Sequence, residues 1–132
     1  MELPRILIDT SVVIEHLRKQ NRRKSILYRI ADDYALYTST IVEFELYAGT
    51  TDRQKRHDVQ DILSWCTILP FTSDVAAIGG ALYRELKATN QLIEIRDIFI
   101  AATALTYSLP LMTLNLGHFD RVEGLQLLSP LT

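Results

Sequence analysis

Three acidic residues lie in apolar stretches of the chain, where an unpaired carboxylate is costly to bury. Asp9 follows a short apolar run, Glu45 interrupts another, and Asp97 precedes a long apolar run that contains several alanines. Carboxylates without a cluster of cysteines or histidines are the ligands that hard cations such as Mg²⁺ or Mn²⁺ prefer. Such an ion can activate a water molecule, polarise a phosphoryl oxygen and stabilise the leaving oxygen. The pattern therefore predicts metal-dependent hydrolysis of a phosphodiester.

Asp9 and Asp97 also have structural explanations. An aspartate between a strand and a helix is a good N-cap, although Thr10 or Ser11 could cap the same helix. An aspartate in the first turn of a helix is favoured by the helix dipole. The dipole does not explain why alanines occupy the i+4 and i+7 positions beside Asp97, where they would leave room for an ion. For both aspartates the structural and the functional interpretation stay open.

The two glutamates of the segment 40–49 have different explanations. Thr40 and Glu43 have the spacing of a capping box, in which the glutamate bonds back to the start of its helix. Glu45 has no such structural task, because its neighbours on the same helix face are the apolar or small residues Ile41, Val42, Ala48 and Gly49. We therefore assign Glu45, rather than Glu43, to the candidate site.

These acids are positioned by short apolar strands that alternate with amphipathic helices. The sequence predicts strands over 5–8, 34–38, 67–70, 111–114 and 125–128. It predicts helices over 11–17, 26–30, 40–49, around 59–66, from 73 towards Asn90, and over 97–107. This alternation indicates an α/β fold, a three-layer α/β/α sandwich with a short, mainly parallel central sheet. In such folds ligands bind at the carboxyl ends of the strands, where Asp9 lies.

The bulk composition is that of one globular domain spanning residues 1–132. The single cysteine, Cys66, lies among apolar residues and is interpreted as a core residue, which favours a reducing compartment. Neither an export signal nor an apolar run long enough to span a membrane is visible. We therefore expect a cytoplasmic protein that does not enter a membrane.

The charge of the chain is nearly balanced, with a formal net charge of −2, which argues against broad electrostatic binding of nucleic acid. Basic residues nevertheless cluster in the segment 18–29. Such a cluster either contacts phosphates or forms a solvated loop between helices. The candidates for phosphate contacts are Arg18, Lys19, Arg22, Arg23 and Lys24.

The motifs, taken in order, resemble those of the PIN-domain family, and within it the VapC-type toxins. The segment 7–13, Leu-Ile-Asp-Thr-Ser-Val-Val, resembles the opening strand of the family with its first metal-binding aspartate. The segment 39–49, which ends Glu-Leu-Tyr-Ala-Gly, resembles the family's Glu-Leu-x-x-Gly motif, and this register selects Glu45. The segment 97–105 resembles the Asp-x-x-Ile-Ala-Ala helix, and 112–119 with 124–125 resembles the closing strand and loop.

This resemblance implies a compact α/β/α fold, a Mg²⁺ or Mn²⁺ site and endoribonuclease activity on RNA. It also implies a homodimer and a small antitoxin partner that blocks the acidic pocket. By position, Asp9 and Asp97 become metal ligands and Glu45 completes an acidic triad. Unstacked RNA is the expected substrate, because a crevice reaches a splayed strand more easily than a stacked one.

The closing segment departs from some relatives, which carry a further acid there. Asn115 and His118 occupy this neighbourhood, with Asp120 slightly further on. Asn115 could orient a water molecule or a phosphate oxygen from the end of its strand, and Thr10 could hydrogen-bond to a ligand water. His118 is interpreted as a surface or hydrogen-bonding residue, so a second metal ion stays open.

Two other functions compete with the nuclease. An aspartyl-nucleophile phosphatase would use Asp9 as its nucleophile, but such enzymes usually carry a second aspartate where this chain has Ser11. A non-catalytic binding module would keep the fold without the activity. Retention of all three acids argues against this second alternative.

Overall fold

A computed structural model of the chain describes residues 2–130. Its sheet has five parallel strands in the order β3-β2-β1-β4-β5, so the first strand lies in the centre. The strands are β1 (Arg5–Ile8), β2 (Ala35–Ser39), β3 (Thr67–Leu69), β4 (Leu111–Met112) and β5 (Leu127–Leu128). The α-helices are α1 (Thr10–Arg18), α2 (Ile26–Ile30), α3 (Thr40–Ala48), α4 (Arg53–Leu63), α5 (Ser73–Ala88) and α6 (Ile95–Thr106). Two 3₁₀ turns complete the described elements, η1 (Arg22–Lys24) and η2 (Leu116–His118).

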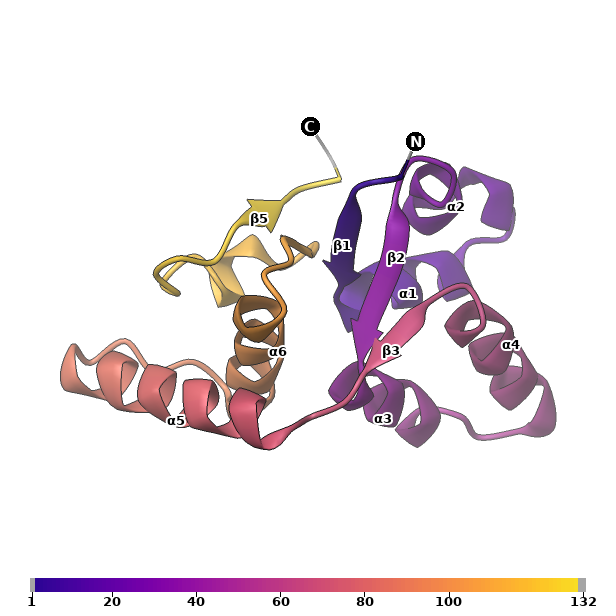
Figure 1. The fold of residues 1–132 in the computed structure, drawn as a ribbon. Coiled ribbons are helices and arrows are strands. Elements are labelled where there is room, and N and C mark those ends of the chain that lie inside the picture. Colours follow the sequence, from indigo (N-terminus) through magenta and orange to yellow (C-terminus); the bar gives the residue numbers. More distant parts are fainter. Residues whose placement is uncertain (1, 131–132) are drawn as a thin grey trace.

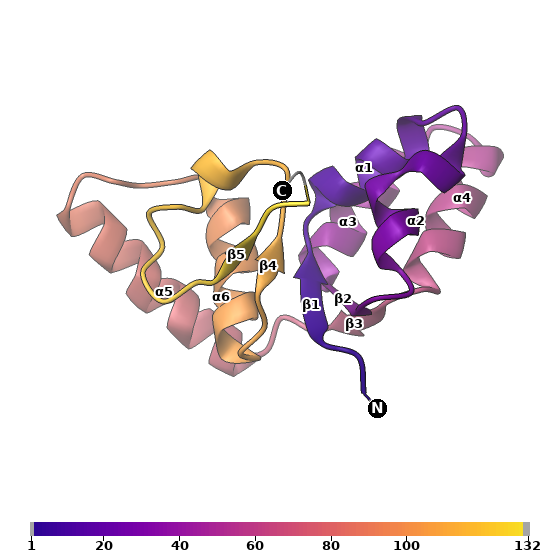
Figure 2. The ribbon, with the colours of Figure 1, turned by 90° about the horizontal axis from the view of Figure 1, so that it is seen from above.

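The helices lie on both sides of the sheet (Figure 1). The chain moves outward from β1 to β2 and β3, and then returns across the sheet to β4. Because crossovers between parallel strands are right-handed, this change of direction places α5 and α6 on the face opposite to the helices that precede β3. Figure 2 shows these two groups of helices on either side of β1. The predicted α/β class with a parallel central sheet is confirmed.

The core is centred on β1. Ile6, Leu7 and Ile8 are all fully buried, as expected for a parallel strand that is covered on both faces. Cys66 is partly buried against this core, and burial raises the pKa of its thiol to about 12. It therefore behaves as the packing residue that its apolar surroundings predicted.

The predicted capping box of α3 is wrong. The N-cap is Ser39, whose hydroxyl accepts a hydrogen bond from the Val42 amide at 3.2 Å. The residue three positions after this cap is Val42, so Glu43 has no reciprocal bond to make. Glu43 is instead an acid in the first turn, where the helix dipole favours it.

Several predicted boundaries shift by a few residues. Helix α6 begins at Ile95 rather than at residue 97, which places Asp97 inside its first turn. The predicted strand 111–114 ends at Met112, because the next side chain, that of Thr113, turns to Asp9. The last strand contains only Leu127 and Leu128 of the predicted 125–128.

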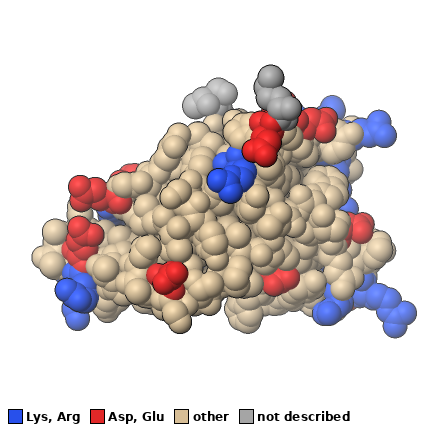
Figure 3. Space-filling view, in the orientation of Figure 1, with Lys and Arg blue, Asp and Glu red and all other residues tan. Residues whose placement is uncertain are grey.

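Charged side chains of both signs are interspersed around the edge of the face drawn in Figure 3, and its middle is largely uncharged. This face carries no continuous basic surface among the residues described, which agrees with the nearly balanced charge. None of the helices within residues 2–130 is long and apolar enough to cross a membrane.

Candidate active site

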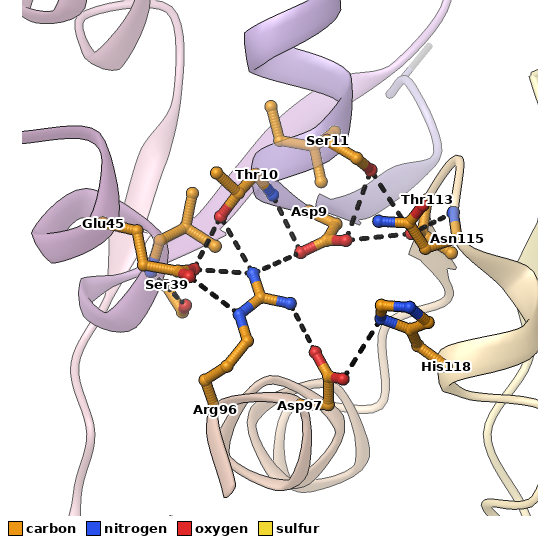
Figure 4. Close-up of polar contacts among 12 residues, drawn as sticks. Asp9, Thr10, Ser11, Ser39, Glu45, Arg96, Asp97, Thr113, Asn115 and His118 are labelled. Atoms are coloured by element: carbon orange, nitrogen blue, oxygen red, sulfur yellow. Dashed lines mark hydrogen bonds and ion pairs between the residues drawn. The ribbon is translucent and has the colours of Figure 1, made fainter. Parts of the chain in front are cut away.

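The three predicted acids meet at the carboxyl end of the central strand, although they come from different elements (Figure 4). Asp9 follows β1 and caps α1, Glu45 lies on α3, and Asp97 lies in the first turn of α6. Parallel strands end at the same edge of a sheet, so α1 and α3, which follow β1 and β2, begin close together. Helix α6 leads into β4, so its first turn lies at the same edge. This topology brings together carboxylates that are far apart in the sequence.

Asp9 is fully buried, and both of its carboxylate oxygens accept hydrogen bonds. Oδ1 accepts from the amide of Thr10 at 2.8 Å and from Nη2 of Arg96 at 3.0 Å. Oδ2 accepts from the hydroxyl of Thr113 at 2.9 Å and from that of Ser11 at 3.3 Å. Asp9 is thus a helix cap and a member of the carboxylate cluster at once, so the two interpretations of this residue are compatible.

Glu45 is the most accessible of the three acids, with 28% of its side chain exposed. Its Oε1 accepts a hydrogen bond of 2.7 Å from the hydroxyl of Thr10 and one of 2.6 Å from Nη2 of Arg96. Its Oε2 accepts from Nε of Arg96 at 2.8 Å. Glu45 therefore has partners for its charge and still reaches the solvent.

Asp97 is almost fully buried and lies between two cationic or potentially cationic groups. Oδ1 accepts a hydrogen bond from Nη1 of Arg96, and Oδ2 lies 3.3 Å from Nδ1 of His118. Burial raises the pKa of Asp97 above its ordinary value, and the Arg96 hydrogen bond and charge offset this only in part. His118, which is about half exposed, is placed as a hydrogen-bonding residue beside the cluster.

Arg96 is the residue that the sequence analysis missed. Its guanidinium donates to all three acids and to the hydroxyl of Thr10, the last at 3.0 Å. Burial acts to lower the pKa of Arg96, but the hydrogen bond to Glu45, the charge of Asp9 and the hydrogen bonds to Asp97 and Asp9 outweigh it and raise the pKa. One signal was present in the sequence, because a cation beside the first turn of a helix is disfavoured by the helix dipole.

An open cavity of about 700 Å³ lies next to the cluster. Its lining residues include Asp9, Thr10, Glu45, Arg96 and Asn115. The predicted supporting residues Thr10 and Asn115 are therefore placed with the acids, whereas Asp120 is not among the lining residues. Thr113, whose hydroxyl donates a hydrogen bond of 2.9 Å to Asp9, was not predicted.

The basic segment divides into two parts. Arg18 and Lys19 line the same cavity as Asp9 and Glu45. Arg22 forms an ion pair with Asp58 at 3.1 Å. Arg23 and Lys24 are exposed on η1 and do not line the cavity. Only the first part of the predicted cluster therefore lies where it could meet a phosphate held at the acids.

The donor set of the cluster suits a hard cation, since it offers carboxylate, hydroxyl and amide oxygens and no thiolate. Within residues 2–130, however, no group of three or more His, Cys, Asp or Glu side chains is arranged to hold an ion as it stands. The guanidinium of Arg96 lies between the carboxylates (Figure 4). The carboxylate oxygens of Asp9 and Asp97 are therefore suitable ligands for a divalent ion, and the guanidinium of Arg96 occupies the space between them.

Comparisons with known proteins agree with this arrangement. Residues 6–125 match the family model of the PIN domain. Ribonuclease VapC19 of Mycobacterium tuberculosis is 31% identical over 121 residues, which cover 91% of this chain and 96% of the relative. The solved structure of FitAcB from Neisseria gonorrhoeae is similar with a TM-score of 0.77 at 30% identity, covering 96% of this chain and 98% of that chain.

A toxin–antitoxin complex from Klebsiella pneumoniae shares the fold, with a TM-score of 0.75 at 23% identity over 95% of this chain and 97% of that chain. The family match spans the strand that precedes Asp9, the helix with Glu45 and the helix with Asp97. From this match and from the carboxylate cluster at the end of the central strand, we conclude that the chain belongs to the PIN-domain family.

Proposed function

We propose that the protein is an endoribonuclease, the toxin of a toxin–antitoxin pair, and that Asp9, Glu45 and Asp97 form its catalytic centre. The observation that carries the proposal is the convergence of these three acids around Arg96, next to an open cavity that Asp9 and Glu45 line. Relatives that match nearly the whole chain, such as Ribonuclease VapC19, support the reaction and its RNA substrate.

Asp9 and Asp97 are the residues that would hold a divalent ion, Mg²⁺ or Mn²⁺. Two carboxylates are a usual number for Mg²⁺, which keeps several waters and takes phosphate oxygens as further ligands. When bound, the ion supplies a site for water activation and neutralises charge on the phosphate and on the leaving oxygen. This donor chemistry supports a divalent ion and leaves its identity to experiment.

The residues of the chain have distinct tasks in this proposal. Thr113 and Ser11 hold one oxygen of Asp9, so the carboxylate keeps a fixed orientation. Thr10 orients Glu45, whose partly exposed carboxylate is placed to accept a proton from a water in the cavity. Asn115 also lines the cavity, where its amide can hydrogen-bond to a phosphate oxygen or a water.

Arg18 and Lys19 would contact the RNA backbone at the rim of this cavity. The cavity is open, which suits an unstacked strand rather than a duplex. Contacts to phosphates carry no sequence information, so the identity of the cleaved RNA depends on other groups of the cavity.

A second groove, of about 510 Å³, continues from the cavity and shares Ile14, Arg18 and Glu45 with it. This continuity supports an antitoxin that covers the groove and blocks the acidic cavity.

We also propose a homodimer, which is supported by exposed apolar side chains on α3 and at the start of α6, among them Phe44 and Ile95. Trp65 is also exposed, whereas Tyr47 and Tyr83 are partly buried. We place the protein in the cytoplasm, where a lone cysteine stays reduced.

The test is cleavage of a pool of cellular RNA by the purified, antitoxin-free protein in Mg²⁺, in Mn²⁺ and in EDTA. We expect cleavage that needs the metal ion and that is lost in Asp9→Asn and in Asp97→Asn, with circular dichroism showing that both variants fold. Cleavage that persists in EDTA or in both variants would reject the proposed centre. A covalent aspartyl phosphate on Asp9 would instead identify a phosphatase, and RNA binding without cleavage would identify a binding module.

A further inference from the structure

Arg96 contacts the carboxylate cluster with every nitrogen of its guanidinium. Nε and Nη2 donate to Glu45, Nη2 also donates to Asp9, and Nη1 donates to Asp97. The side chain extends from α6 into the space between the three acids and is only 24% exposed (Figure 4). One cation of the chain itself thus occupies the centre of the candidate metal site.

The oxygens that Arg96 holds are the ones that face the shared space. Oδ1 of Asp9 and Oδ1 of Asp97 both accept from the guanidinium. The other oxygen of Asp9 is held by Thr113 and Ser11, and that of Asp97 faces His118. A divalent ion held by Asp9 and Asp97 would therefore compete with Arg96 for these carboxylates.

The hydrogen bonds of the cluster are complete in this arrangement. Every buried side-chain nitrogen and oxygen atom within the described part of the chain has a hydrogen-bond partner. Without Arg96, two buried carboxylates and a third, partly exposed one would lie close together with no strong cation among them. Such a group is costly unless it is paired, so the arginine stabilises the fold before any metal arrives.

The position of Arg96 in its own helix supports the same reading. It lies in the first turn of α6, where the partial positive charge of the helix dipole disfavours a cation. That turn also lacks a side-chain cap. The residue is therefore poorly placed for its helix and well placed for the three acids, which indicates that its interaction is with the cluster.

We propose that Arg96 is the internal counter-ion of the metal-free site and that a divalent ion binds by displacing its guanidinium from Asp9 and Asp97. The inference rests on the proposed function in so far as it assumes a metal site at these acids. It assigns Arg96 a task besides holding the ligands in place, because the same contacts that stabilise the metal-free protein compete with the ion. The metal affinity then depends on how much more strongly the carboxylates bind the divalent ion than they bind the guanidinium of Arg96.

The first experiment is a titration of Mn²⁺ by isothermal calorimetry into antitoxin-free protein, comparing the wild type with Arg96→Gln, Arg96→Lys and Arg18→Gln. Arg18 is the matched control, since it lines the same cavity and the structure shows no hydrogen bond or ion pair between its side chain and any of the three acids. We expect Arg96→Gln to bind Mn²⁺ about tenfold more tightly than the wild type, because the ion no longer displaces charge-assisted hydrogen bonds. Arg96→Lys, which keeps the charge but not the fork of donors, should lie between them, and Arg18→Gln should stay within about threefold of the wild type.

Melting temperatures give a second readout that does not need activity. In EDTA, Arg96→Gln should melt below the wild type, because the carboxylates lose their counter-ion. Saturating Mn²⁺ should raise its melting temperature by more than it raises that of the wild type. Equal or weaker Mn²⁺ binding by the folded Arg96→Gln variant would overturn the proposal, because Arg96 would then only hold the ligands in place.

A third measurement uses the wild type alone and so does not depend on a variant that folds. The Nε–H resonance of Arg96 is followed by NMR during a titration with Mg²⁺. We expect it to shift and to exchange faster with water as the ion binds, together with shifts of the amides around Asp9 and Asp97. Amide shifts with an unchanged Arg96 resonance would reject displacement while leaving the metal site intact. No amide shift at all would reject the metal site itself, and the displacement with it.

Discussion

The hydroxyl of Thr10 donates a hydrogen bond of 2.7 Å to Oε1 of Glu45, and the amide of the same residue donates one of 2.8 Å to Asp9. One residue of α1 therefore fixes two acids from different parts of the chain. Asp9 is held by its own helix start, whereas Glu45 depends on a neighbour for its position. Thr10 thus sets the relative placement of these two carboxylates together with Arg96, which also donates hydrogen bonds to both.

Thr10→Val should lower the kcat/KM of RNA cleavage by about tenfold or more, since a hydrogen bond to a charged group contributes roughly 1.5–3 kcal/mol. Valine keeps the shape of threonine, so the loss reports the hydroxyl rather than packing. The hydrogen bond from the backbone amide of residue 10 to Asp9 does not depend on the side chain and should persist. Thr10→Ser, which keeps the hydroxyl, is the control, and a valine variant as active as the serine variant would contradict this role of Thr10.

The basic residues at the rim of the cavity should act on RNA binding rather than on the reaction. In the double variant Arg18→Gln with Lys19→Gln, we expect a KM raised several-fold with kcat little changed, as for residues that bind substrate and transition state alike. The slope of log affinity against log salt concentration should become shallower by about 1.4, since each phosphate contact of a single strand contributes about 0.7.

The matched control for that measurement carries the same change of charge on η1, in Arg23→Gln with Lys24→Gln. These two side chains do not line the cavity, so the salt slope should stay close to that of the wild type. Equal effects of the two double variants would show that general electrostatic attraction, rather than a local contact, brings RNA to the site.

His16 makes the stability of the fold depend on pH. It is buried, its Nδ1 lies 2.6 Å from the hydroxyl of Ser25, and burial together with the charge of Arg22 lowers its pKa below 6.5. Because the folded pKa is below the unfolded one, the unfolded chain binds more protons in this range. The contribution of His16 to stability is therefore present above about pH 6.5 and is lost as the pH falls through the lowered folded pKa.

The measurement is urea unfolding of the wild type, of His16→Gln and of His57→Gln at about pH 7.5 and about pH 5.5. The loss of unfolding free energy between the two pH values should be smaller in His16→Gln than in the wild type. His57 is exposed on α4, so its replacement should leave most of that loss in place. If His16→Gln lost as much unfolding free energy as the wild type, the pH dependence of stability would come from carboxylates and not from His16.

Larger side chains at two adjacent glycines of α5, Gly79 and Gly80, should change the free energy of unfolding in opposite directions. A Cβ at Gly80 meets no atom within 4 Å. Gly80→Ala should therefore stabilise the protein by about 0.5–1 kcal/mol, because alanine lowers the conformational entropy of the unfolded chain. A Cβ at Gly79 meets the Cβ of Ala102 at 3.5 Å, so α5 and α6 pack closely at this point. The larger side chain of Gly79→Leu should force the helices apart, at a cost of about 1–3 kcal/mol.

Unfolding in urea measures both changes. Since α6 carries Arg96 and Asp97, Gly79→Leu should also lower RNA cleavage beyond what its stability explains. A Gly79→Leu variant as stable as the wild type would show that the contact between α5 and α6 is looser than the distances indicate.

Much of the fold follows from local patterns. A fully apolar run such as 6–8 is compatible with a buried parallel strand, and such strands alternate with helices, which predicts the layers and places Asp9 at a strand end. Local patterns were less reliable at helix starts. Both Ser39 and Thr40 can cap α3, and the choice of Ser39 depends on where β2 ends, which is a property of the sheet.

The sequence by itself determined which acids were candidates for one site, because a carboxylate in apolar surroundings needs a reason to be there, and Asp9, Glu45 and Asp97 each lie in such surroundings. It could not reveal that Arg96 joins them, because a single arginine beside a helix start is ordinary until its long side chain is placed in space. Only the tertiary structure decided this, by bringing three helix segments to one edge of the sheet, where the electrostatic attraction of three carboxylates acts on one guanidinium. The tertiary structure also decided which basic residues lie near the acids. Arg18 and Lys19, at the end of α1, line the cavity, whereas Arg23 and Lys24, which follow a few residues later, do not.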